Sequence, residues 1–223
     1  MNITDFEKKI GYKFKNTALL DRALTHSSYA NENGTGLDNE RLEFLGDSVL
    51  GFITAEYLFE HYKNNPEGEL TKKRAYAVCE KTLFGYAEKI GLGDMIKLGK
   101  GEERTGGRHR PSVVSDAFEA LLAAIYLDGG IEEAKKFVLP FVETATETQP
   151  VFKDYKSILQ EVLQQNPTEK IEYIVTGESG PDHNKQFTVE VHLNSNVIGK
   201  GVGSSKKRAE QEAARSALEL MGL

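Results

Sequence analysis

Residues 39–50 read Asn-Glu-Arg-Leu-Glu-Phe-Leu-Gly-Asp-Ser-Val-Leu, which sets three acids, Glu40, Glu43 and Asp47, in an otherwise apolar stretch. In a helix of 3.6 residues per turn, offsets of three and seven residues bring these carboxylates onto one narrow arc. Apolar residues occupy nearly every other side of the segment, which is typical of a helix buried inside a protein. The pattern therefore predicts a buried helix that carries an acidic stripe.

Helical patterns extend through the whole first part of the chain. Apolar residues at three- and four-residue spacing predict helices over 39–62, 69–90, 112–127 and 131–143. Stretches rich in glycine, proline or asparagine separate these segments. Residues 1–147 are therefore expected to form an all-α domain.

The pattern changes after residue 144. Residues 144–153 are polar, contain a proline and lack an apolar period, which is typical of a linker. The segments that follow are a short amphipathic helix over 155–165, strands over 171–177, 185–193 and 196–202, and an alanine-rich helix over 204–221. We expect a multidomain chain in which a linker at 148–153 leads to a second domain at 154–223, an α+β module of order α-β-β-β-α.

Composition excludes several classes of protein. The 223 residues carry 28 Lys and Arg against 34 Asp and Glu, a net charge of −6, so any nucleic-acid site has to be a local cluster of cations. A single cysteine, Cys79, excludes a disulfide framework and a multi-cysteine zinc site and is in keeping with a cytoplasmic protein. No apolar run of about 18 residues and no signal or transit pattern is present, so we expect no membrane association.

A second pair of acids, Asp116 and Glu119, lies in the predicted helix over 112–127, which contains no Lys or Arg. Small neighbours such as Ala120 and Ala123 leave room for another group beside these acids. Carboxylates held close together repel one another unless a cation joins them, and oxygen-only ligands suit Mg²⁺ or Mn²⁺. A metal site and a plain acidic surface stay open as alternatives, because spacing alone does not show whether the two helices meet.

Residues 39–47 resemble the signature of the ribonuclease III family. Three other stretches resemble the same family, namely Ala-Leu-Thr-His-Ser-Ser-Tyr at 23–29, Gly-Glu-Leu-Thr-Lys-Lys-Arg at 68–74 and Ser-Asp-Ala-Phe-Glu-Ala-Leu at 115–121. The resemblance covers essentially the whole chain and implies an all-α endonuclease domain followed by a double-stranded RNA-binding domain. It further implies a homodimeric, metal-dependent endoribonuclease that hydrolyses double-stranded RNA with Mg²⁺ or, as a substitute, Mn²⁺, and without an organic cofactor. The implied products have 5′-phosphate and 3′-hydroxyl ends with short 3′ overhangs, and the implied substrates include ribosomal RNA precursors.

The resemblance also implies roles for individual acids. The positions that match the metal-binding carboxylates of the family are Glu43, Asp47, Asp116 and Glu119. Within this set we expect Asp47 and Glu119 to lie most directly on the metal and to form the catalytic pair. Glu40 and Glu67 match acidic positions that the family places at the dimer interface or near the RNA, so they are interpreted as accessory residues.

Cations in the second domain concentrate near its last helix. Residues 199–208 contain four Lys and Arg, and Lys206 and Lys207 are expected in the first helical turn with Ser204 or Ser205 as N-cap. Lysines at this end oppose the helix dipole, whereas a phosphate would be bound there by free N–H groups and lysines together. The cluster therefore predicts a phosphate contact.

Two further RNA contacts are expected in this domain. Ser157, Gln160 and Gln164 share one stripe of the predicted helix over 155–165, and uncharged hydrogen-bonding side chains suit the shallow minor groove of A-form RNA. His183 lies in the loop between the first two predicted strands and is expected to supply another contact. The loop Gly-Pro-Asp-His at 180–183 and the Ser-Lys-Lys helix start together resemble the double-stranded RNA-binding domain.

Two other functions stay open. A regulator that binds double-stranded RNA without cleaving it would explain the second domain but not the retention of four carboxylates. A metal-dependent phosphohydrolase for small molecules would explain the acids but not the second domain.

Overall fold

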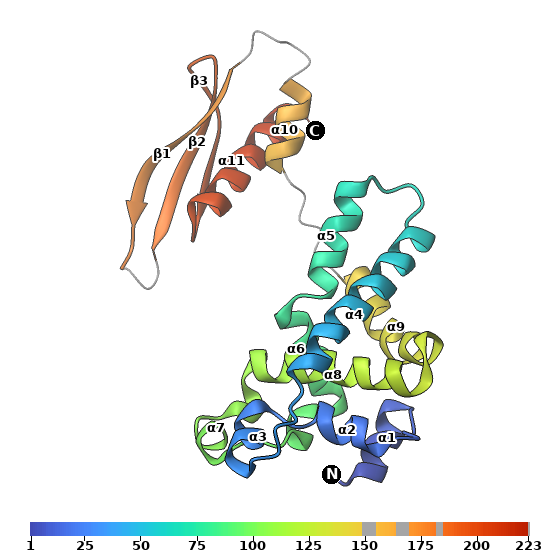
Figure 1. Ribbon diagram of the computed structural model, residues 1–223. Coiled ribbons are helices and arrows are strands. Elements are labelled where there is room, and N and C mark those ends of the chain that lie inside the picture. The colour runs from blue at the N-terminus through green and yellow to red at the C-terminus, as the bar shows by residue number, and fades with distance from the viewer. Residues whose placement is uncertain (149–154, 164–169, 182–184, 223) are drawn as a thin grey trace. The chain divides into compact units, whose positions relative to one another are not determined.

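The computed structural model describes residues 1–148, 155–163, 170–181 and 185–222 (Figure 1). The chain divides into two compact units, Met1–Gln149 and Pro150–Leu223, which are described separately. The first unit is helical and the second combines helices with an antiparallel sheet, which confirms the predicted fold class. Among the described residues, no helix combines the length and the apolar character needed to cross a membrane.

The first unit is built around one central helix, α8 (Pro111–Gly129). Its residues from Ala120 to Ile125 are fully buried, because its alanines and large apolar side chains face neighbouring helices on every side. Pro111 occupies the first turn, where its missing N–H costs no hydrogen bond. The other α-helices of this unit are α1 (Ile3–Ile10), α2 (Thr17–Ala23), α3 (Ser27–Asn33), α4 (Glu40–His61), α5 (Glu67–Ala77), α6 (Glu80–Ile90), α7 (Lys100–Arg104) and α9 (Ile131–Thr148), and two short 3-10 helices cover Leu92–Met95 and Gly107–His109.

The helix predicted over 69–90 is two helices, so this prediction was wrong. Helix α5 ends at Ala77, and Cys79 has extended backbone angles and precedes α6. The hydroxyl of Tyr86 donates a hydrogen bond of 3.2 Å to the carbonyl oxygen of Ala77, which satisfies an otherwise unpaired group at the end of α5. The sequence carries no glycine or proline at this break, so periodicity alone did not reveal it.

Helix α9 extends beyond the predicted range of 131–143 and includes the first five residues of the stretch interpreted as a linker. It passes through Pro140, whose missing N–H removes one hydrogen bond of the helix. Burial of Val138 and Val142 on either side holds this part of the helix in the core. Threonine hydroxyls in the last turns donate to carbonyl oxygens four residues earlier, as Thr144 does to Pro140 at 2.8 Å.

The second unit has two helices on one face of a three-stranded antiparallel sheet of order β1-β2-β3 (Figure 1). Its elements are α10 (Tyr155–Leu163), β1 (Ile171–Ser179), β2 (Gln186–Leu193), β3 (Asn196–Gly203) and α11 (Lys206–Leu220). Val189 and Val191 of β2 are fully buried, as the alternating pattern predicts. Gly201 of β3 lets α11 lie directly on the sheet, since a Cβ atom there would stand 2.2 Å from the backbone nitrogen of Ala213.

Candidate metal centre and RNA-binding surface

Helices α4 and α8 approach each other closely at Gly46. This glycine is buried, and a Cβ atom on it would stand 2.0 Å from the carbonyl oxygen of Glu119. Any larger residue would hold the two backbones apart. Glu43 lies three residues before Gly46 and therefore on the same side of α4, which brings its carboxylate to the crossing.

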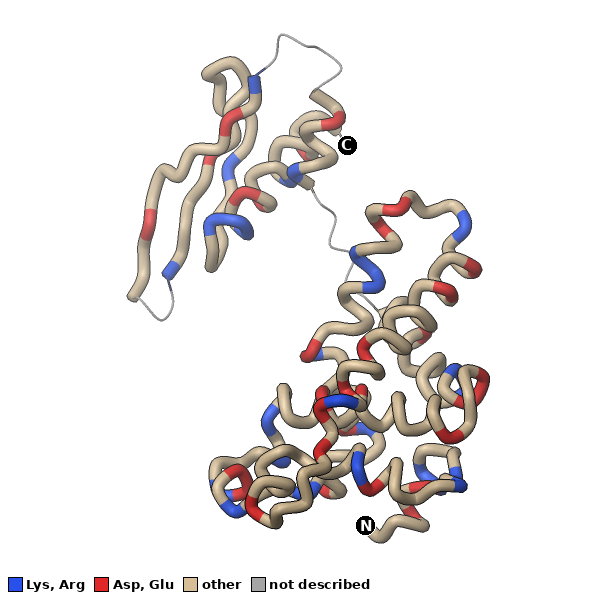
Figure 2. The backbone as a smooth tube through the Cα atoms, viewed as in Figure 1, with Lys and Arg blue, Asp and Glu red and all other residues tan. Residues whose placement is uncertain are grey.

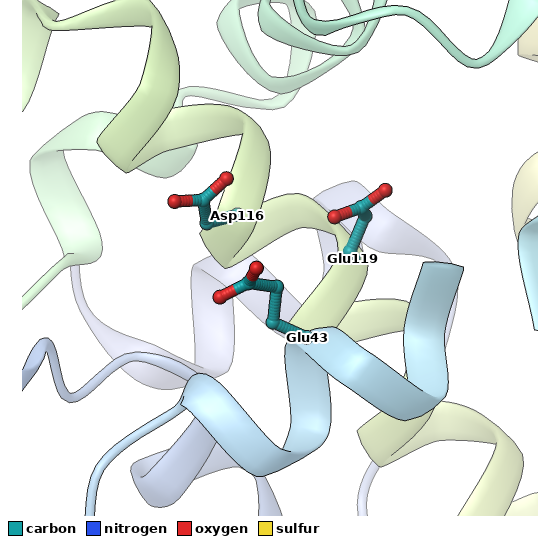
Figure 3. A group of neighbouring side chains, drawn as sticks. All are labelled: Glu43, Asp116 and Glu119. Carbon is teal, nitrogen blue, oxygen red and sulfur yellow. The ribbon is translucent and has the colours of Figure 1, made fainter. Parts of the chain in front are cut away.

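Three acids meet at this crossing, one from α4 and two from α8 (Figure 3). Glu43, Asp116 and Glu119 each offer a carboxylate oxygen, and these oxygens all lie within 4.8 Å of one another. All three residues are half-buried. The two acidic pairs that the sequence left separate therefore come from helices that do meet.

Burial and mutual repulsion disfavour the charged forms of these acids. The pKa of Glu119 is raised to about 8, first by burial and then by the charges of Asp47, Asp116 and Glu43. Burial also raises the pKa of Asp116 and of Glu43, with further increments from neighbouring carboxylates. A bound cation would remove this penalty, and a donor set made only of carboxylate oxygens fits a hard divalent ion.

Asp47 lies beside this group rather than within it. It is exposed, and it does not belong to the set of oxygens within 4.8 Å that the described residues form. Its charge is nevertheless the largest of the neighbouring charges that raise the pKa of Glu119. The structure thus brings together three of the four predicted metal ligands and places the fourth next to Glu119.

The two accessory acids occupy different places. Glu40 is the first residue of α4, is exposed, and contributes to the raised pKa of Glu43. Glu67 is the first residue of α5, where its Oε1 accepts a hydrogen bond of 2.7 Å from the Thr71 hydroxyl.

Sequence reasoning missed Glu80 as a neighbour of the site, and it missed the glycine that shapes the site. The charge of Glu80, at the start of α6, raises the pKa of Asp116, and His26 lowers it. Glu80 was hidden inside the helix predicted over 69–90, and the break before α6 gives it a place at a helix start. Gly46 had a usable signal, because a glycine inside an apolar helix often marks a close approach of another backbone.

The predicted phosphate-binding end of the second unit is the start of α11, where Lys and Arg cluster (Figure 2). Lys206 and Lys207 are the first two residues of this helix. Of the two candidate N-caps, Ser205 takes the position, since its Oγ accepts a hydrogen bond of 3.2 Å from the N–H of Arg208. The carboxylate of Glu178 lies 3.8 Å from the Lys206 Nζ, so the protein itself supplies an anion at this helix end.

Ser157 and Gln160 are exposed on α10, whereas Leu159, between them in the chain, is buried. This agrees with the stripe predicted from their spacing. Gln164 and His183, the other two predicted RNA contacts, lie outside the described residues.

Known proteins resemble this chain along nearly its whole length. Residues 16–144 match the Ribonuclease-III-like family, and residues 155–221 match the double-stranded RNA binding motif. Ribonuclease 3 of Clostridium tetani is 50% identical over 225 residues, covering 99% of this chain and 95% of that protein, and Ribonuclease 3 of Clostridium perfringens is 46% identical over 225 residues, covering 100% and 95%. A solved structure of the nuclease domain of ribonuclease III from Campylobacter jejuni, 43% identical, superposes with a TM-score of 0.61 over 65% of this chain and 98% of that one. The chain, with its helical nuclease domain followed by a double-stranded RNA binding motif, therefore belongs to the ribonuclease III family.

Proposed function

We propose that the cluster of Glu43, Asp116 and Glu119 is the catalytic centre of this ribonuclease, with Asp47 as a fourth ligand of its metal. Membership of the ribonuclease III family makes the chain an endonuclease for double-stranded RNA. The observation that carries the assignment of the site is the meeting of three half-buried carboxylates at the crossing of α4 and α8.

The family is metal-dependent, and the donor set suits Mg²⁺, with Mn²⁺ as a substitute. When bound, such an ion supplies a deprotonated water for attack on the phosphodiester and stabilises charge on the leaving oxygen. The protein contributes ligands held by packing: Glu43 by the helix crossing, Asp116 and Glu119 by the buried helix α8. We assign the most direct contacts to Glu119 and Asp47, whose exposed carboxylate faces solvent beside Glu119.

We further propose that the enzyme works as a homodimer through an exposed aromatic stripe on α4. Phe44, Phe52 and Phe59 are 79%, 56% and 75% exposed and fall within an arc of about 80° on the helix. Phe52 also lines an adjoining hollow of about 280 Å³, whose other lining residues are Leu45, Ser48, Val49, Tyr126 and Ile131.

An exposed aromatic stripe beside a hollow suits binding of a second copy of the chain. A two-fold axis brings the same surface of both copies together, so that the stripe of each copy can contact the hollow of the other. The solved nuclease domain from Campylobacter jejuni supports this proposal, since it is described as having a flexible region involved in dimer formation.

In the second unit we assign RNA contacts to Lys206, Lys207, Ser157 and Gln160. Gln164 is added from its sequence spacing with Ser157 and Gln160, and His183 from its place in the loop between the first two predicted strands. Glu40 and Glu67 are assigned accessory roles at the dimer interface or near the RNA rather than on the metal. We place the junction between the two domains at 148–153.

The substrates we propose are structured RNAs of the cytoplasm, ribosomal RNA precursors among them. The enzyme cuts them to leave 5′-phosphate and 3′-hydroxyl ends.

The test is cleavage of one long RNA duplex by the full chain, with and without Mg²⁺, beside binding measured by gel shift in Ca²⁺. We expect cleavage only with Mg²⁺, no cleavage of the corresponding single strands, and ends that accept a 5′ label only after phosphatase treatment. Glu119→Gln should abolish cleavage while binding survives. Glu132→Gln, which changes an exposed acid on α9, is the matched control and should cut like the wild type.

Cleavage in the presence of a chelator would contradict a metal mechanism. A Glu119→Gln chain that cuts at the wild-type rate at low Mg²⁺ would show that Glu119 is not a ligand. Binding without any cleavage by the wild type would favour the regulator, and hydrolysis of small phosphodiesters in preference to duplex would favour the phosphohydrolase.

A further inference from the structure

One carboxylate of the second unit forms ion pairs with two lysines. The Oε2 of Glu178, on β1, lies 2.7 Å from the Nζ of Lys185, and its Oε1 lies 3.8 Å from the Nζ of Lys206. Both ammonium groups also lie 5.7 Å from the centre of the Phe187 ring. Glu178 therefore links the residue just before β2 to the first residue of α11.

A β-bulge places Glu178 in this position. Val175 pairs with Val189, but the register then shifts by one residue, so that Glu178 pairs with Phe187. Residues directly opposite each other in an antiparallel pair project from the same face, and Phe187 packs against the core beneath α11. Without the extra residue, Glu178 would project from the opposite face, because a shift of one residue exchanges the faces of a strand.

The three charged groups are accessible to a ligand. The side chains of Glu178, Lys185 and Lys206 are 40%, 41% and 59% exposed. The neighbouring lysines, Lys185 foremost, hold the pKa of the Glu178 carboxyl below its usual range, so the group is ionised at neutral pH. An anion thus already lies at the helix end where phosphate is expected to bind.

We propose that Glu178 is an internal competitor for RNA phosphate: duplex binding transfers Lys206, and with it Lys185, from this carboxylate to the RNA backbone. The proposal rests on the RNA-binding role given above to the start of α11. Glu178 then lowers the affinity for duplex in two ways, since its ion pairs with the lysines have to be broken and its own charge repels the phosphate. The opposite role, in which Glu178 positions the lysines for RNA, predicts weaker binding when its charge is removed.

Glu178→Gln separates these roles, because it keeps the shape of the side chain and removes its charge. The matched control is Glu172→Gln on the same strand. Glu172 is paired with Lys170 at 2.6 Å, and its change to glutamine removes the same single charge. It lies six residues before Glu178, or roughly 20 Å along β1. Duplex affinity is measured with the full chain in Ca²⁺, which permits binding without cleavage, over a series of salt concentrations.

We expect Glu178→Gln to bind duplex about two- to five-fold more tightly at low salt, the size of an exposed charge interaction, while Glu172→Gln binds like the wild type. The advantage should shrink as salt rises, and it should disappear when Lys185 and Lys206 are both changed to alanine.

Unchanged or weaker binding by Glu178→Gln would overturn the proposal, as would an equal gain in Glu172→Gln or a gain that persists without the two lysines. These results would leave the proposed function intact. A wild-type chain that fails to bind duplex at any salt concentration would instead overturn the proposed function, and this inference with it.

Discussion

Gly46 and Glu119 are in backbone contact across the crossing of α4 and α8, and a Cβ atom at residue 46 would stand 2.0 Å from the Glu119 carbonyl oxygen. Glu119 is one of the three acids of the site, and Gly46 lies three residues after a second one, Glu43, on α4. Packing and site geometry are therefore coupled here, since any change that separates the helices also separates Glu43 from Glu119.

Gly46→Ala should destabilise the protein and lower cleavage together. The added methyl group has no room against α8, and overpacking of this kind typically costs about 1–3 kcal/mol. Gly51→Ala in the same helix is the control, because nothing lies within 4 Å of a Cβ atom there, and loss of a helical glycine should stabilise by roughly 0.5–1 kcal/mol. Urea unfolding of both variants checks the prediction. Equal unfolding midpoints for Gly46→Ala and Gly51→Ala would contradict it.

Glu119→Gln should remove a pH dependence from the stability of the metal-free protein. The pKa of Glu119 is about 8 in the fold against an ordinary value of 4.5, so between these values the folded state retains a proton that the unfolded chain has released. Stability therefore falls as pH rises through this window. As the pH rises from 5 to 8, the free energy of unfolding of the wild type should fall by at least about 1 kcal/mol relative to that of Glu119→Gln.

Thermal or urea unfolding in a chelator across this pH range measures the effect. Mg²⁺ should restore most of the lost stability of the wild type at pH 8, because it binds the folded site, and it should do less for Glu119→Gln. Glu132→Gln should follow the wild-type curve. Parallel curves for the wild type and Glu119→Gln would show that burial does not hold a proton on this carboxyl.

Phe59→Asp should convert the proposed dimer to a monomer. Phe59 is 75% exposed on α4, and a buried charge in a two-fold interface appears twice and stays unpaired in both copies. Leu220→Asp is a suitable control, because Leu220 is 78% exposed but lies on α11 in the other unit. Sedimentation velocity over a concentration series gives the result, and a Phe59→Asp chain that still sediments as a dimer would place the interface elsewhere.

Lys206→Ala combined with Lys207→Ala should weaken duplex binding and flatten its dependence on salt. Each phosphate contact that is lost should lower the magnitude of the log–log slope by roughly 0.7–0.9. Lys136→Ala on α9, a solvent-exposed lysine of the first unit that pairs with Glu133, serves as the control. If the slope of the double variant equals that of the wild type, these lysines do not contact the backbone of the RNA.

Much of this protein could be predicted from local patterns. Period-3.6 apolar spacing marked α4 and α8, period-2 alternation marked β2, and the stretch at 39–47 marked the family, because these signals depend only on neighbours a few residues apart. The acids were found in the same way, since their offsets put them on single helical faces. The order of the two domains followed from the change of pattern after residue 144.

The remaining features depend on contacts between residues far apart in the chain. The packing at Gly46 determines that the two acidic helices meet. It thereby brings carboxylate oxygens of Glu43, Asp116 and Glu119 within 4.8 Å of one another, while Asp47 lies beside them. The passage of α9 through Pro140 reflects the burial of Val138 and Val142, which overrides local propensity. At the break before α6, the end of α5 is completed by the hydrogen bond from Tyr86 to Ala77, nine residues away in the chain. The bulge in β1 likewise results from pairing with β2, and it brings Glu178 to the face of the sheet that carries α11, where period-2 alternation alone would not place it.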